Sequence, residues 1–205
     1  MGQYIGFGLL TIAWLALVYF FRRYRIWLVY YCLGAVGLTL LLIFAGARLT
    51  PLERWLELAT TSGAHAFCEV LGIPTHVFEA TPGDILVWVV VQDPGWTIVR
   101  VDVECSGFLE MAVLIGLLSF YPTWSFIRRL GYMALGAVAL FGANLLRVMT
   151  ILSILHIFGK SSIFLAHTII GRIVFFVLAI GVYWLLLSRL TIRDLGVSIQ
   201  ARMRA

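Results

Sequence analysis

The sequence contains few charged residues: 12% of its 205 positions are Asp, Glu, Lys or Arg, and 62% are hydrophobic. Soluble domains carry about 25% charged residues, so this composition excludes a soluble globular protein and indicates one that crosses a lipid bilayer. Fourteen of the fifteen basic residues are Arg. These arginines flank apolar runs and do not alternate with aromatic residues, which excludes the basic surface of a nucleic-acid-binding protein.

Several catalytic motifs are also missing. The chain has no His-Glu-x-x-His sequence, which disfavours a zinc metalloprotease, no Gly-x-Ser-x-Gly nucleophile elbow and no P-loop. Its three cysteines, Cys32, Cys68 and Cys105, form no Cys-x-x-Cys pair, which argues against a disulfide framework or a thioredoxin-like centre. We therefore expect no metal and no other cofactor.

Five apolar runs have the length of a membrane-spanning helix, about 20 residues. Arginines follow the first, third and fifth runs, so the positive-inside rule puts these ends in the cytoplasm and the N-terminus outside. The sequence therefore predicts an all-α membrane protein with about five transmembrane helices. The predicted spans are residues 3–21, 26–47, 106–127, 130–157 and 163–187.

The chain divides into four predicted parts. Residues 1–47 hold the two N-terminal spans, residues 105–190 a three-helix catalytic core, and residues 191–205 a basic cytoplasmic tail. Residues 48–104 contain most of the acidic residues and no spanning run, so we expect a small extracytoplasmic insertion. Helical spacing through residue 71 predicts an amphipathic helix there. A turn at residues 92–95 between β-branched runs predicts a β-hairpin ending at residue 104.

Three reactive side chains are predicted to lie at one depth. Cys105 begins the third span at its outer end, Arg147 lies about three turns from the outer end of the fourth, and His167 about one turn below the outer start of the fifth. An imidazole can activate a thiol nucleophile, and a guanidinium offers donors to a developing oxyanion. The set is equipped for acyl transfer through a thioester. We expect Asn144, on the same helix face as Arg147, to hold that guanidinium.

Each residue also has a structural interpretation. Cys105 could be a packing residue at a helix start, Arg147 could extend to lipid headgroups, and His167 could be a hydrogen-bonded core histidine. Arg172 could bind a substrate carbonyl or a lipid phosphate, but we first expect it to pair with Glu110.

The remaining thiols and imidazoles have simpler expectations. His156, near the end of the fourth span, is the rival imidazole at headgroup level, whereas His65 and His76 are expected in solvent or at the interface. Cys68 is expected to pack among apolar residues, with a bond to Cys105 as the alternative.

Three short motifs resemble the exosortase/archaeosortase family of multi-pass membrane cysteine transpeptidases. They occur in the family's order, each at the outer side, within roughly residues 82–187 of a chain shorter than the larger bacterial exosortases. The resemblance implies Cys105 as nucleophile, with Arg147 and His167 completing the catalytic set. We expect support from neighbouring polar residues. The motifs are Cys105-Ser106-Gly107, Asn144-Leu145-Leu146-Arg147 and His167 followed by Gly171-Arg172, and the supporting residues are Glu104, Ser106, Asn144 and Arg172.

The resemblance implies an enzyme that cleaves and transfers proteins bearing a C-terminal sorting signal, made of a short motif, a hydrophobic helix and a basic tail. It places the protein in the bacterial cytoplasmic membrane with the active site facing outside. The implied partners are that substrate and the bilayer, without nucleic acid, and the oligomeric state stays open. The alternative is a non-enzymatic membrane scaffold or transporter subunit for envelope polysaccharide or lipid export, with Arg147 and Arg172 binding anionic groups.

Overall fold

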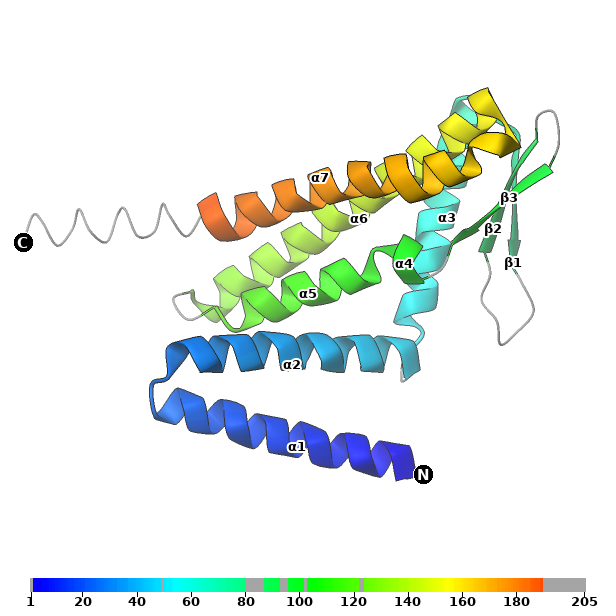
Figure 1. Ribbon diagram of the computed structural model, residues 1–205. Coiled ribbons are helices and arrows are strands. Elements are labelled where there is room, and N and C mark those ends of the chain that lie inside the picture. The colour runs from blue at the N-terminus through cyan, green and yellow to red at the C-terminus, as the bar shows by residue number, and fades with distance from the viewer. Residues whose placement is uncertain are drawn as a thin grey trace, which may run out of the picture.

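The computed structural model describes residues 2–48, 50–79, 87–92, 96–101, 103–121 and 124–189. Five apolar helices run side by side in alternating directions (Figure 1). A further helix, α3 (Leu52–Val70), crosses this bundle steeply at one end, and a small sheet lies beyond it. The five bundle helices are α1 (Gly2–Arg23), α2 (Trp27–Arg48), α5 (Phe108–Ser119), α6 (Phe126–Phe158) and α7 (Gly171–Tyr183).

Four helical segments of the described chain are long and apolar enough to cross a bilayer. A helix suits that role because it satisfies its own backbone hydrogen bonds. The chain is therefore a multi-pass membrane protein with mostly helical structure. The four segments are Gly6–Arg23, Trp27–Arg48, Phe126–Phe158 and Lys160–Ser188.

The predicted third span is not one long helix. It consists of a single turn, α4 (Val103–Ser106), followed by the 12-residue α5, which ends at Ser119. Gly107, with φ +72°, separates the two. The sequence of the predicted span also contains a proline, which disfavours a helix interior because it lacks the backbone N–H and its ring clashes with the preceding turn. The prediction of residues 106–127 as a continuous helix was therefore wrong.

The last spanning segment is helical but irregular. It begins with the short 3₁₀ turn η1 (Lys160–Ser162) and contains wide π-helical turns on both sides of α7. A π-helical turn carries an extra residue and so changes the direction in which its side chains leave the helix; such turns are frequent at functional sites. The two π-helical turns are η2 (Leu165–Ile170) and η3 (Trp184–Arg189).

The insertion carries three antiparallel strands in the order β1 (Thr75–Glu79), β2 (Val87–Gln92) and β3 (Trp96–Val101). In this register Val77 lies opposite Val89, which lies opposite Val99. The predicted hairpin runs correspond to β2 and β3, while β1 was not predicted. The prediction that the strand continues to residue 104 was wrong, because residues 103–106 are helical. Residues 93–95 of the predicted turn and the predicted tail, 191–205, lie outside the described residues.

Two apolar cores meet on α6. One lies between α3, α6 and the sheet and includes Cys68 and Leu152. The other lies between α5, α6 and α7 and includes Leu140 and Phe175. Two polar residues of α6, Asn144 and Arg147, lie between the α6 residues of the two cores and are therefore enclosed from both sides.

Candidate active site

Cys105 lies in α4, the helical turn that leads from β3 into α5, and its side chain is 4% exposed. The left-handed conformation of Gly107 redirects the chain directly after this turn. A Cβ atom at Gly107 would lie 3.2 Å from Cβ of Asn144 on α6. Glycine therefore serves two purposes here: it accepts the positive φ, and it lets the turn that carries Cys105 approach α6 closely.

The thiol of Cys105 contacts an imidazole from a distant part of the chain. Its Sγ atom lies 3.5 Å from Nε2 of His167, 62 residues later in the sequence. His167 lies in the π-helical turn η2, next to fully buried Ala166. This is hydrogen-bonding distance for sulfur, so the imidazole is placed to exchange a proton with the thiol.

A guanidinium approaches the same sulfur from α6. Arg147 is 5% exposed, and its Nη2 atom lies 3.9 Å from Sγ of Cys105. Its Cζ atom lies 5.5 Å from the centre of the Phe175 ring on α7, a cation–π geometry. Sequence analysis missed Phe175, although it follows His167 by eight residues, about two helical turns. The permanent cation beside the sulfur favours the thiolate form.

Asn144 binds the backbone of the turn that carries Cys105. The sequence had predicted a bond to Arg147 instead. The Asn144 side chain is completely buried, and its Nδ2 donates a hydrogen bond of 2.6 Å to the carbonyl oxygen of Cys105. Its Oδ1 has no hydrogen-bond partner among the described residues. The physical reason is the close approach at Gly107, which brings the α4 carbonyl within reach of α6.

Cys105 has two polar neighbours in the sequence, Glu104 and Ser106. Ser106 is completely buried, and its Oγ accepts a hydrogen bond of 3.2 Å from the backbone N–H of Phe108. This bond satisfies one of the N–H groups at the start of α5. The side chain of Glu104 is not among those described.

The expected ion pair between Arg172 and Glu110 was wrong: no such pair occurs in the described part of the chain. Both residues instead line a cavity of about 660 Å³ between α5 and α7, which Arg147 also lines. The backbone carbonyl oxygen of Glu110 accepts a 2.9 Å hydrogen bond from the hydroxyl of Tyr183. Oε2 of Glu110 is buried without a hydrogen-bond partner in the described residues.

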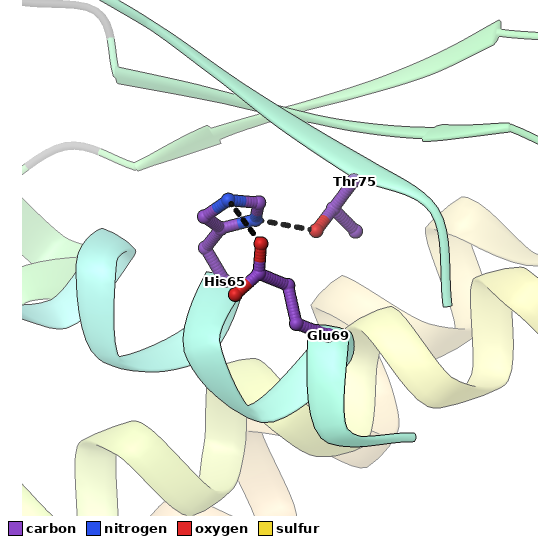
Figure 2. A network of polar contacts seen from close by, with 3 residues as sticks. All are labelled: His65, Glu69 and Thr75. Carbon is purple, nitrogen blue, oxygen red and sulfur yellow. Dashed lines mark hydrogen bonds and ion pairs between the residues drawn. The ribbon is translucent and has the colours of Figure 1, made fainter. Parts of the chain in front are cut away.

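His65 is partly exposed and forms polar contacts within the insertion. Its Nδ1 lies 2.7 Å from Oγ1 of Thr75 and its Nε2 3.6 Å from Oε1 of Glu69 (Figure 2). Because Thr75 starts β1 while the other two residues lie on α3, this network ties the sheet to the helix. We assign His65 a structural role.

Cys68 is a buried packing residue, with 1% of its side chain exposed. Burial raises the pKa of its thiol, and the hydrogen bond with Thr75 offsets that effect only in part. Neither Cys68 nor Cys105 forms a disulfide, and Cys32 is an exposed thiol on α2.

His156 lies in the last turn of α6, with Nδ1 buried and without a hydrogen-bond partner among the described residues.

Sequence analysis also overlooked Glu57. This carboxylate is only 2% exposed and lies on the buried face of α3 with Thr61, Ala64 and Cys68. Its spacing of seven and eleven residues from Ala64 and Cys68 was the available signal.

The described residues contain no group of three or more His, Cys, Asp or Glu side chains that could hold a metal ion.

The fold and this cluster define a class of protein: a multi-pass membrane protein that buries a thiol beside an imidazole and a guanidinium, the groups required for thiol-based acyl transfer. The family model for transmembrane exosortases (Exosortase_EpsH) matches residues 2–185, and the chain belongs to that family. Exosortases are in general cysteine peptidases or transpeptidases of the membrane. Comparison with curated proteins and with solved structures finds no match.

Proposed function

We propose that this protein cleaves membrane-anchored proteins near the extracytoplasmic surface and transfers them to an acceptor, with Cys105 as the nucleophile. The observation that carries the proposal is the contact of one sulfur with two catalytically useful groups. The Sγ atom lies 3.5 Å from the imidazole of His167 and 3.9 Å from the guanidinium of Arg147. The substrate class, proteins with a C-terminal sorting signal, comes from the family resemblance.

In the first half-reaction, Nε2 of His167 accepts the thiol proton and the thiolate attacks the carbonyl carbon of the scissile peptide bond. The resulting oxyanion is stabilised by Arg147, whose donors act strongly because the side chain is 5% exposed. Collapse of the intermediate breaks the C–N bond. The His167 proton passes to the leaving nitrogen, and the released fragment departs as an amine.

In the second half-reaction, an acceptor amine or water attacks the thioester carbonyl carbon. Its proton goes to His167, the C–S bond breaks, and the sulfur takes the proton back. The enzyme is thereby restored. Asn144 fixes the Cys105 carbonyl throughout both steps, and this keeps the sulfur between its two partners.

The arginines at the helix ends support an extracytoplasmic site. Arg22, Arg23 and Arg25 lie at the turn between α1 and α2, and Arg128 and Arg129 at the start of α6. Both turns lie at the end of the bundle opposite α3 and the sheet (Figure 1). By the positive-inside rule that end is cytoplasmic, so α3, the sheet and the cysteine turn face outside.

The edge of the sheet offers a place for an extended substrate segment. In the described sheet β3 is an edge strand, since it pairs with β2 on one side. The chain passes from Val101 at the end of β3 to Cys105 within four residues. A substrate strand added to β3 would therefore run toward the sulfur.

The test replaces Cys105 by Ala and by Ser in cells that make the protein. Mass spectrometry then follows envelope proteins that end in an apolar helix and an Arg-rich tail. We expect these precursors to accumulate uncleaved in both variants, whereas Cys32→Ala and Cys68→Ala should leave processing unchanged. Normal processing in Cys105→Ala would overturn the proposal. A scaffold would instead tolerate Cys105→Ser and fail with Arg147→Ala.

A further inference from the structure

The cavity between α5 and α7 shares one residue, Arg147, with the cysteine site. Leu109 and Glu110 of α5 form one wall, Arg147 of α6 lines it, and a strip of α7 forms the other wall, enclosing about 660 Å³. Arg147 connects this cavity with the cysteine site, because its Nη2 atom lies 3.9 Å from Sγ of Cys105.

The α7 wall has the pattern of a helix-packing seam. Ile173, Phe176, Ile180 and Tyr183 line the cavity at spacings of three, four and three residues. That period presents one continuous stripe to a neighbouring helix. Its first three members are 58%, 64% and 51% exposed. Exposure alone is normal for a lipid-facing residue, but here the stripe lines a hollow about 15 Å long, the rise of ten helical residues.

Charged groups in the hollow distinguish its occupant from a lipid tail. Glu110 has a buried carboxylate oxygen without a hydrogen-bond partner, and Arg172 forms no ion pair, within the part of the chain that the structure describes. Ionisable groups at membrane depth are costly unless a ligand or partner compensates them. An acyl chain has no polar group to offer, whereas a polypeptide leaving its helix has backbone N–H and C=O groups free to bind both.

We propose that this hollow is the docking groove for the apolar membrane-spanning helix of the protein substrate, which enters sideways between α5 and α7. The inference rests on the proposed function and specifies where the substrate lies. The substrate helix packs on the Ile173–Tyr183 stripe, its polar end meets Glu110 and Arg172, and the chain beyond it passes Arg147 to reach Cys105. A second copy of this chain is less well matched, because it would present a helix to the sulfur without a scissile segment.

The test uses the full-length protein in lipid nanodiscs with a synthetic probe, a 20-residue Leu/Ala helix with an Arg-rich tail. A photoreactive p-benzoylphenylalanine replaces Phe176 or Ile180, which line the groove, or Val177, which is 61% exposed on the same helix but does not line it. We expect about tenfold more crosslinked probe from positions 176 and 180 than from 177, the ratio that about 1.4 kcal/mol of preferential contact gives.

A filling variant checks the groove independently. Ile180→Trp should lower crosslinking from position 176, while Val177→Trp should not. Equal yields at all three positions, or crosslinks joining two copies of the chain, would overturn the inference.

Reaction of Cys105 with methyl methanethiosulfonate, measured in a Cys32→Ser/Cys68→Ser background, separates the two proposals. If Cys105 reacts faster than an unactivated thiol but the probe does not crosslink to the groove, only the proposed docking groove is wrong. If the probe crosslinks to the groove but Cys105 reacts no faster than an unactivated thiol, the proposed chemistry is wrong.

Discussion

Gly107→Ala is the most informative single substitution, because it adds a single methyl group close to the nucleophile. Gly107 has φ +72° and directly follows the turn that carries Cys105. The chain also offers a matched control. Gly72 has φ +71°, but a Cβ atom there would meet nothing within 4 Å.

The two costs of the substitution can be separated. A left-handed conformation with positive φ costs an L-residue roughly 1–2 kcal/mol, and Gly72 shares that cost with Gly107. At Gly107 the new Cβ would also lie 3.2, 3.4 and 3.6 Å from Cβ, Cγ and Nδ2 of Asn144. Overpacking of a buried site costs about 1–3 kcal/mol. Gly107→Ala should therefore destabilise the protein more than Gly72→Ala does, by about that second amount.

Two measurements check this reasoning. Thermal unfolding in detergent should show a larger fall in Tm for Gly107→Ala than for Gly72→Ala, by about 2–4 °C for each kcal/mol. Alkylation of Cys105 should slow only in Gly107→Ala, because displacement of Asn144 weakens its 2.6 Å hydrogen bond to the cysteine carbonyl. Equal Tm losses in the two variants, together with unchanged alkylation in Gly107→Ala, would refute the close-approach argument.

Three further predictions address the reactive groups. His167→Gln should slow alkylation of Cys105 at pH 7 by about tenfold or more, because the thiol loses the imidazole that accepts its proton, while His156→Gln should not. Arg147→Lys keeps the charge but loses the planar donors, and should reduce substrate cleavage by about 10²–10³-fold in the same processing assay. Burial raises the pKa of Cys68 above 9.0, so its contribution to stability is complete below pH 9 and is lost as the pH rises through the raised value; Cys68→Ala should lessen the fall in Tm above pH 9.

The bundle was largely readable from the sequence because its signals are local. A long apolar run flanked by arginines forms a helix in lipid whatever its neighbours do, since each backbone group bonds within the helix. The described parts of α1, α2, α6 and α7 follow such runs. The third run failed as a prediction because an apolar average gives little weight to Gly107, where the helix is interrupted, or to a proline in the sequence.

The strand β1 and the role of Asn144 could not be read in the same way. The run from Thr75 to Glu79 is short, and it becomes a strand because β2 offers it a partner. Asn144 shares a helix face with Arg147, which led to the expected bond between them. Its observed partner, the Cys105 carbonyl, is 39 residues away, and that contact depends on the absence of a side chain at Gly107.

By itself the sequence determined the class of protein, the path of most helices, and a common depth for Cys105, Arg147 and His167. Helix rise converts residue number into depth, so that inference needs no knowledge of packing. Only the tertiary structure decided the rotation of each helix about its axis, because helices that are apolar on all sides carry no pattern that fixes it. That rotation sets the distances at the sulfur, the position of Phe175 under the guanidinium and the hollow between α5 and α7.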